Sequence, residues 1–237
     1  MSFLIAVHVN EGIVLASDRR ATFTNTQIID NKIVKSVGIH TTNSMEKTFL
    51  CPNGAGISYC GDASLLGKPI TGFIQDMIRC EISEECRIEN MPQIIIDYFN
   101  KQSTIPDTSF IVAGYDTSND GQKVQTIFEL YVKSKEINPI DTSLQGATWH
   151  GETSTLRRLI QNVAVKTEDD QYEDLPFEEI LWEYLTLQDA VDFARYAVET
   201  TIQTMRFKNV VETVGGPIDV LVITPDMTSW LQKESLQ

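Results

Sequence analysis

The chain opens with two apolar runs, Ser2-Phe3-Leu4-Ile5-Ala6-Val7-His8-Val9 and Gly12-Ile13-Val14-Leu15-Ala16-Ser17-Asp18. The polar pair Asn10-Glu11 stands between them and is followed by a glycine. Two apolar runs separated by so short a polar break are typical of a β-hairpin. The sequence therefore predicts strands over 3–9 and 12–17, with the turn at Asn10-Glu11-Gly12.

Ser2 directly follows the initiator Met1, and methionine aminopeptidases tolerate a small second residue. If Met1 is removed, Ser2 carries a hydroxyl and a free α-amine, whose ordinary pKa is about 7.7–8.0. Such an amine can take the proton of the hydroxyl and so activate it as a nucleophile. The alternative is that Ser2 has no function, as in most proteins with serine at this position.

Composition describes an ordinary globular protein of 237 residues, with 42% hydrophobic and 22% charged residues. This length fits one core, so we expect a single domain over 1–237. The chain has no apolar run of about 18 residues, which predicts no transmembrane helix. It also lacks the basic and cleavage-site features of a signal peptide, which predicts a cytoplasmic protein.

The net charge of −14 argues against nucleic acid and membranes as partners, since both carry negative charge. Arg19-Arg20 and Arg157-Arg158 are isolated basic pairs. The cysteines, at positions 51, 60, 80 and 86, do not have the short spacings of zinc sites, and the three histidines are scattered. The sequence therefore predicts no metal and no cofactor.

The remaining chain alternates between strand and helix patterns in blocks. Further strands are expected over 33–39, 47–51, 56–60, 108–115, 124–132 and 218–224. Helices are expected over 64–80, 91–102, 153–164 and 187–206, the last with Thr186 as N-cap and Asp189 at its third position. Loops are expected over most of 22–44 and over 168–174. Strands grouped with strands and helices with helices indicate an α+β fold rather than a parallel β-α-β array.

Five segments carry a resemblance to a known family: Gly12 to Thr22, Glu46-Lys47-Thr48-Phe49, Tyr59-Cys60-Gly61-Asp62-Ala63, Gly146 to Gly151 and Gly215 to Thr224. Their order and spacing resemble proteasome β-subunits, which are N-terminal-nucleophile (Ntn) hydrolases. The Val-Gly-Gly-Pro-Ile-Asp ending is most similar to the bacterial Anbu and HslV-like homologues. The resemblance implies a four-layer αββα sandwich of two antiparallel sheets flanked by helices.

The resemblance also assigns site residues. Counting back from Asp18 places Ser2 on the catalytic N-terminal threonine of the family. Lys47 falls on the catalytic lysine, and Asp18 would hold it by a charge-assisted hydrogen bond. Ser58 falls on the glycine whose backbone N–H donates to the oxyanion. The substrate pocket would be lined by Ala21, Gly56 and Cys60. Without the resemblance, Asp18 would be interpreted as a surface partner of Arg19, and Lys47 as a solvated lysine.

Several positions depart from the family. The nucleophile is serine rather than threonine, and about a dozen additional residues lie between Thr22 and Lys47. Val211 and Val214 replace an aspartate and a serine that support the N-terminal amine, and His150 replaces a further serine. His150 could act as a proton shuttle beside Ser2, or it could be a packed residue next to Trp149.

The resulting hypothesis is a hydrolase that cuts peptide or other amide bonds through Ser2 once Met1 is removed, which here requires no propeptide cleavage. The resemblance implies a homo-oligomer, a ring or spiral, acting on peptides or unfolded proteins, and leaves an ATP-dependent unfoldase open as a partner. Helices 64–80 and 187–206 would supply the contact faces. The alternatives are a catalytically impaired proteasome-like scaffold or binding subunit and, less well matched, a small-amide acylase.

Overall fold

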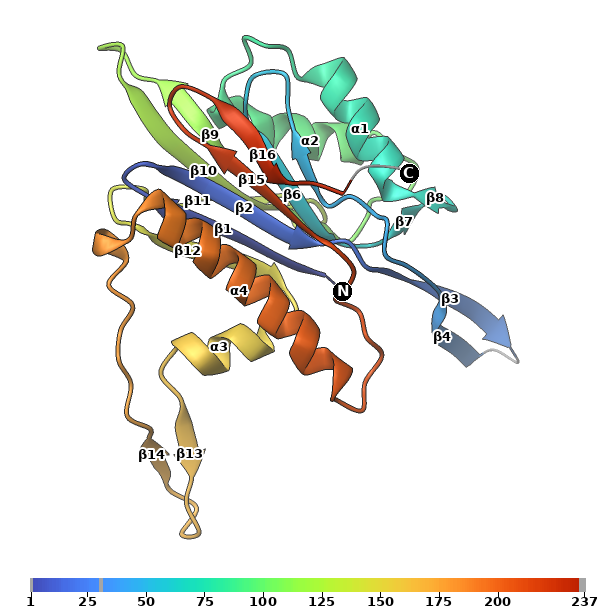
Figure 1. Ribbon diagram of the computed structural model, residues 1–237. Coiled ribbons are helices and arrows are strands. Elements are labelled where there is room, and N and C mark those ends of the chain that lie inside the picture. Colours follow the sequence, from blue (N-terminus) through green and yellow to red (C-terminus); the bar gives the residue numbers. More distant parts are fainter. Residues whose placement is uncertain (1, 30–31, 235–237) are drawn as a thin grey trace.

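The computed structural model describes residues 2–29 and 32–234 (Figure 1). Its first sheet has five antiparallel strands in the order β12-β1-β2-β15-β16. These strands are β1 (Phe3–Val9), β2 (Gly12–Asp18), β12 (Gly146–Gly151), β15 (Ile218–Ile223) and β16 (Thr228–Gln232). The predicted N-terminal hairpin is confirmed, with Leu4 opposite Ser17 and Val9 opposite Gly12.

The second sheet also has five antiparallel strands, in the order β11-β10-β9-β6-β5. They are β5 (Thr48–Leu50), β6 (Gly56–Gly61), β9 (Thr108–Thr117), β10 (Lys123–Tyr131) and β11 (Glu136–Pro139). The four strands predicted for this part of the chain are confirmed with shifts of a residue or two at their ends. β11 was not predicted.

Helices cover the outer face of each sheet (Figure 1). They are α1 (Ile70–Glu81), α2 (Met91–Asn100), α3 (Ser154–Ile160) and α4 (Leu187–Arg206), with short 3-10 turns η1 (Ile88–Asn90) and η2 (Trp182–Tyr184). α4 packs on β1, β2 and β15 of the first sheet, and α3 packs on α4. α1 and α2 share a core with the second sheet, and a third core fills the space between the sheets. The predicted α+β fold of four layers, αββα, is confirmed.

The strand β1 is apolar throughout because both of its faces are covered. Phe3, Ile5 and Val7 pack in the core under α4, while Leu4 and Ala6 face the second sheet. All seven residues are buried, as expected for a strand between two layers. Side chains alternate between the two faces of a strand, so a residue two positions before Leu4 belongs to the inward face. This places Ser2 at the end of the space between the sheets.

The long helix α4 begins and packs as the sequence predicts. The Thr186 side chain accepts from the Asp189 backbone N–H, and the Asp189 carboxylate accepts from Thr186 N, which is a complete capping box. Its buried stripe runs from Ala190 to Met205 and belongs to the core over the first sheet. Likewise, the buried residues of α1 belong to the core over the second sheet. The apolar stripes of the two helices predicted as subunit contacts are therefore used inside this chain.

The helix predicted from residue 64 begins only at Ile70. The strands β7 (Ser64–Leu65) and β8 (Lys68–Pro69) form a small hairpin before it. Its turn has Leu66 and Gly67 at φ 51° and 74°, a left-handed conformation that a helix cannot include. Pro69 then takes the N-cap position of α1. The helical spacing of the apolar residues in 64–69 was therefore misleading, because local turn geometry overrides it.

Two hairpins project from the layered body (Figure 1). The strands β3 (Ala21–Ile29) and β4 (Lys32–Thr42) pair along residues that were predicted as mostly loop with one short strand. This hairpin accommodates the additional residues between Thr22 and Lys47 without displacing the lysine. The second hairpin, β13 (Ala164–Lys166) and β14 (Tyr172–Asp174), contains the predicted acidic loop. Both form two-stranded sheets of their own.

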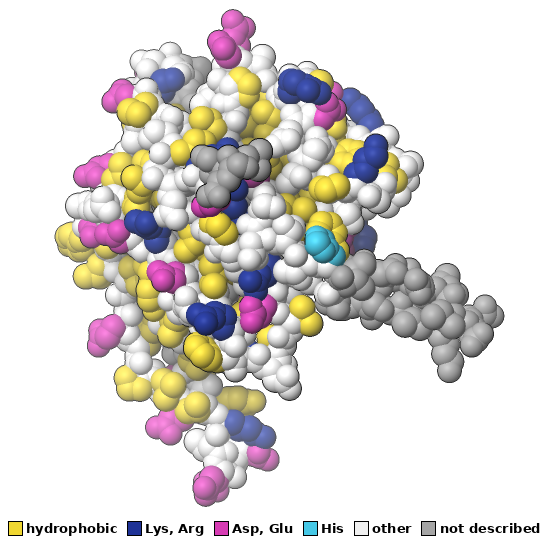
Figure 2. Space-filling view, turned by 45° about the vertical axis from the view of Figure 1, so that its right-hand side comes forward, with side chains coloured by type: hydrophobic (Ala, Val, Ile, Leu, Met, Phe, Trp, Pro, Cys, Tyr) yellow, Lys and Arg dark blue, Asp and Glu magenta, His cyan; other side chains and the backbone are white. Residues whose placement is uncertain are grey.

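The remaining differences are small. The helix predicted over 153–164 is shorter, and the glycine-bearing segment Gly146–Gly151 is the edge strand β12. The strand β16 was not predicted. Among the described residues, no helix is long and apolar enough to cross a bilayer. On the face shown in Figure 2, Lys and Arg side chains are interspersed with Asp and Glu.

Candidate functional site

Asp18 is the hydrogen-bonding centre of the site. Its Oδ1 accepts from Phe3 N at 3.0 Å and from Lys47 Nζ at 2.7 Å. Its Oδ2 accepts from Arg20 N at 3.0 Å and from Gly215 N at 2.9 Å. The side chain is fully buried, so these four bonds replace the water that a carboxylate needs. One carboxylate thus fixes the start of β1, the end of β2 and the loop that leads into β15.

Lys47 brings a positive charge to the same place. Its Nζ also donates to the Arg20 carbonyl at 2.6 Å, and the residue is 1% exposed. Burial lowers the pKa of Lys47 below its ordinary value, and the Asp18 carboxylate opposes this shift. A small cavity of about 10 Å³ lies between Lys47, Ser2 and Tyr59. That volume is enough for about one water molecule, so a water could join Lys47 to Ser2.

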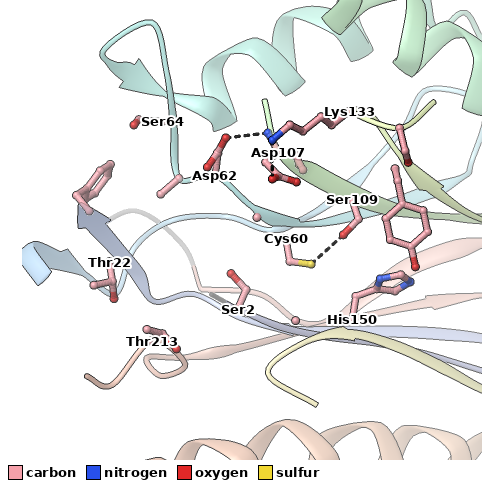
Figure 3. A pocket seen from close by; sticks show the side chains of 17 residues that line it. Ser2, Thr22, Cys60, Asp62, Ser64, Asp107, Ser109, Lys133, His150 and Thr213 are labelled. Carbon is pink, nitrogen blue, oxygen red and sulfur yellow. Dashed lines mark hydrogen bonds and ion pairs between the residues drawn. The ribbon is translucent and has the colours of Figure 1, made fainter. Parts of the chain in front are cut away.

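The backbone around Ser2 is held by the edge strand β12. Ser2 O accepts from Glu152 N at 2.8 Å. Gly151 comes so close that a Cβ on it would lie 1.8 Å from Ser2 O, and its φ is 91°. Only glycine fits this approach. Ser2 itself is 6% exposed and faces a cleft of about 1080 Å³ (Figure 3). Met1, whose removal the hypothesis requires, lies outside the described residues.

The cleft wall opposite Ser2 comes from the second sheet and the turn after β6 (Figure 3). Cys60 Sγ lies 3.2 Å from Ser109 Oγ, and burial raises the pKa of the Cys60 thiol. At the rim, Asp62 accepts from Asp107 N at 2.8 Å, and Lys133 Nζ pairs with Asp107 Oδ2 at 3.1 Å. The wall is therefore rich in hydrogen-bonding groups, which suits a polar ligand.

His150 lies in the same cleft and was a candidate from the sequence. His150 is on β12, where it pairs with Leu4 of β1, and it is 8% exposed. Its Nε2 is 3.1 Å from Glu129 Oε1, and its ring packs on that of Tyr131 with centroids 5.5 Å apart. Sequence reasoning missed Glu129. One sequence signal could have pointed to it. Glu129 is two residues after Ile127 in a predicted strand, so both side chains lie on the face of the second sheet that faces the first.

Ser58 lies outside the cleft, contrary to the expectation for its backbone N–H. It is fully buried in β6 and is paired with Thr48 on one side and Ile111 on the other. Its hydroxyl lies 2.8 Å from Thr48 Oγ1, which in turn lies 2.8 Å from Ser17 Oγ. A residue paired on both sides inside a sheet cannot present its N–H to a substrate.

The three residues predicted to line the substrate pocket lie in three different places. Cys60 lines the cleft, and Ala21 lines the small cavity beside Lys47. Gly56 lies elsewhere, because a Cβ on it would be 2.5 Å from Leu15 Cδ1 and 2.9 Å from Leu221 Cδ2. It therefore allows the two sheets to pack closely and is not a pocket residue.

Of the two valines before the double glycine, Val214 is buried at 1% exposure and Val211 is 45% exposed. Thr213, between them, lines the cleft with Ser2.

Comparisons with known proteins match the fold but not the sequence. No family model matches the chain, and no curated protein sequence does. Anbu from Hyphomicrobium sp. strain MC1 superposes with a TM-score of 0.58 at 14% identity, covering 98% of this chain and 88% of that one. A Gly-1 mutant of the same Anbu gives 0.58 at 13% identity, covering 99% and 86%. Anbu from Yersinia bercovieri, described as an ancestral β-subunit, gives 0.53 at 15% identity, covering 98% and 88%. These likenesses support a proteasome-like Ntn fold.

Proposed function

We propose that the protein is an Ntn hydrolase that cleaves peptide or other amide bonds through an acyl ester on Ser2, after removal of Met1. The observation that carries this proposal is the placement of Ser2 beside the buried Asp18–Lys47 pair and at the mouth of a polar cleft. A buried cation near Ser2 favours the deprotonated forms of its hydroxyl and its amine.

In the proposed reaction, Ser2 Oγ attacks the carbonyl carbon of the substrate amide, and its proton passes to the Ser2 α-amine. The tetrahedral intermediate then collapses, the C–N bond breaks, and the proton moves from the α-amine to the leaving nitrogen. The products of this half-reaction are an amine and an ester on Ser2. Water hydrolyses the ester in the second half-reaction and returns the free hydroxyl.

The oxyanion donor is better assigned to Gly61 than to Ser58. Gly61 lines both the cleft and the small cavity. It follows Tyr59 by two residues, and Tyr59 N donates toward Lys47 O at 2.9 Å. Alternate residues of a strand direct their N–H groups to the same side, so we expect the N–H of Gly61 on the side of β5, past the end of that strand. A side chain is excluded there, because a Cβ would lie 2.2 Å from Asp107 O.

Self-assembly into a homo-oligomer, a ring or spiral, is part of the proposal. The segment that connects α3 to α4 exposes several large apolar side chains: Val165, Tyr172, Leu175, Leu181 and Tyr184. Exposed apolar surface of this kind often marks a protein interface. Light scattering coupled to size-exclusion chromatography measures the assembly, and a monomer at micromolar concentration would contradict it. Peptides or unfolded proteins are the proposed substrates, and an ATP-dependent unfoldase would be a separate partner.

A catalytically impaired scaffold is the second candidate. It is favoured by Val211 and Val214, which provide no hydrogen bond to the amine of Ser2. The exposed apolar segment between α3 and α4 would serve such a scaffold equally well.

One experiment separates the two functions. The protein is incubated with a peptide epoxyketone, and its intact mass and peptide masses are measured. A covalent morpholine-type adduct requires both the hydroxyl and the free amine of Ser2, so an adduct on the wild type that is absent from Ser2→Ala supports the hydrolase. Retained Met1, or no adduct on protein that has lost Met1, would favour the scaffold.

A further inference from the structure

A carboxylate and an imidazole from different sheets meet at the edge of the cleft. Glu129 and Tyr131 alternate with Phe128 and Leu130 on β10, so they share one face of the second sheet. His150 projects from β12 in the first sheet. Ile127, on the same face as Glu129, belongs to the core between the sheets. Glu129 and His150 therefore lie where that apolar core ends and the polar cleft begins.

The strand register places His150 next to Ser2. Leu4 pairs directly with His150, and Ser2 is two residues from Leu4 on the same face of the sheet. Diagonal neighbours of this kind lie about 7–8 Å apart, within reach of a long side chain or of one bridging water. Figure 3 shows both side chains on the same wall of the cleft. His150 can thus reach a water placed over an acyl group on Ser2.

The contacts of His150 determine which ring nitrogen faces that water. Nε2 lies 3.1 Å from Glu129 Oε1, and no other partner among the described residues reaches this buried nitrogen. The separation is that of a hydrogen bond, although the groups are not aligned as one in this state. Thr148, two residues before His150, donates to the same Glu129 oxygen. If the proton is assigned to Nε2, where a small rotation of the ring would align it with Glu129 Oε1, a lone pair is left on Nδ1.

We propose that His150 is the general base of the deacylation half-reaction and that Glu129 is the residue that positions it. This inference rests on the proposed function, since it requires an ester on Ser2. His150 Nδ1 takes a proton from water as the water oxygen attacks the ester carbon. The bond between that carbon and Ser2 Oγ then breaks, and the proton passes to Ser2 Oγ. The products are a carboxylic acid and free Ser2, so neither an oxidant nor a further reactant is required.

The test uses p-nitrophenyl acetate with the wild-type protein, His150→Gln and Glu129→Gln. The release of p-nitrophenol reports acylation, and intact mass reports the ester that accumulates. General bases contribute about 10²–10⁴-fold, so we expect His150→Gln to slow ester hydrolysis by about 10²-fold with acylation little changed. Glu129→Gln keeps the size of the side chain, and we expect it to slow hydrolysis by about 10-fold. Glu136→Gln, on an exposed position of the neighbouring strand β11, is the matched control and should behave as wild type.

Hydroxylamine distinguishes a base from a structural residue. It attacks esters without help from a base, so it should release the acetyl group equally fast from all four proteins. Equal hydrolysis rates in wild type, His150→Gln and Glu129→Gln would overturn the inference. Slower release by hydroxylamine in the variants would also overturn it, because it would indicate a damaged site. If the wild type forms no hydroxylamine-sensitive ester on Ser2, the proposed function itself fails, and the role of His150 fails with it.

Discussion

The two ends of the space between the sheets differ although the same strands form both. At one end, Leu4, Ala6 and Leu15 pack against Ile111 and Ile127 in a closed apolar core. At the other end, the same inward faces carry polar groups. Ser2 on β1, Ser109 on β9 and His150 on β12 line a cleft, and Glu129 on β10 lies beside His150. On β1, β9 and β10 the change takes place within two residues of the core. On these strands, position along the strand therefore separates core from site.

The comparison also shows what the polar end requires to remain folded. The apolar end is stabilised by burial alone, at roughly 25 cal/mol per Å² of apolar surface. The polar end buries the charges of Asp18 and Lys47, which cost free energy unless each is fully hydrogen-bonded. The four hydrogen bonds that Asp18 accepts meet this requirement. The two ends should therefore respond differently to substitution.

The largest effect is expected from Asp18→Asn. It leaves Lys47 as a buried cation without its carboxylate partner, and breaking such a pair typically costs about 3–5 kcal/mol. We expect the free energy of unfolding to fall by about this amount, as measured by urea denaturation, and the labelling of Ser2 by an epoxyketone to be lost. Asp226→Asn, at an exposed position, is the control and should change stability by less than about 0.5 kcal/mol. A similarly small loss in Asp18→Asn would show that the pair does not stabilise the polar end.

Leu15→Ala tests the apolar end. Leu15 is fully buried, and a leucine-to-alanine change in a core costs about 2–5 kcal/mol. We expect a loss of about 3 kcal/mol in urea denaturation. Ser109→Ala, on the cleft wall, removes one hydrogen bond to Cys60 and should cost about 1 kcal/mol. Equal losses in the two variants would argue that the cleft is packed as tightly as the core.

Sequence patterns predicted the strands well because most strands have at least one face in a core. The runs that form β1 and β2 are apolar on both faces, and their short turn leaves one natural pairing. The capping box of α4 was predicted for a similar reason, since it depends on residues three positions apart. The hairpins β3–β4 and β13–β14 lack this signal because each pairs only with itself.

The candidate site was predicted in part: Ser2, Lys47, Cys60 and His150 line the cleft or the small cavity beside it. The family resemblance placed Ser2 by counting back from Asp18 along the hairpin, and placed Lys47 by its neighbours in the sequence. Ser58 and Gly56 were assigned a few residues from the positions that line the cleft, and a strand residue displaced in register changes its surroundings completely. Thr213 reaches the cleft, and Glu129 reaches His150, from distant parts of the chain. Their proximity depends on tertiary packing, which a single sequence does not reveal.

A smaller effect is expected from Gly56→Ala, which tests how closely the sheets approach. A Cβ there would lie 2.5 Å from Leu15 Cδ1, so the apolar end must shift. Overpacking of this kind costs about 1–3 kcal/mol. Gly72→Ala is the matched control, because a Cβ on Gly72, in the exposed part of α1, meets nothing within 4 Å. It should stabilise the protein by about 0.5–1 kcal/mol, since alanine favours a helix. A neutral Gly56→Ala in thermal and urea denaturation would contradict the close packing.

The smallest expected effect is a difference in the rates at which the cysteine thiols are modified. Cys80 is exposed, Cys60 lines the cleft, and Cys51 lies in the core under α1 and α2. Burial raises the pKa of the Cys51 thiol to about 12 and also raises the pKa of Cys60. Only the thiolate reacts, so iodoacetamide at pH 8 should modify Cys80 first, Cys60 slowly and Cys51 last, as followed by peptide mass spectrometry.

The order in which the Cys60 and Cys51 thiols react shows whether the cleft admits ligands. Both thiols are nearly inaccessible in the static structure, at 5% and 3% exposure, so a difference in rate must come from opening. If the cleft admits ligands, Cys60 should react before Cys51, and a peptide bound in the cleft should protect Cys60 alone.

The pH dependence of stability gives a second test. The folded state keeps the Cys51 proton above the ordinary pKa of 9.0, so the free energy of unfolding should fall as pH rises from about 9 toward 12. Cys51 should then become reactive together with global unfolding, whereas Cys60 should react before it. The reverse order would show that the helix-covered layer opens more readily than the cleft, and that the polar end is as closed as the apolar one.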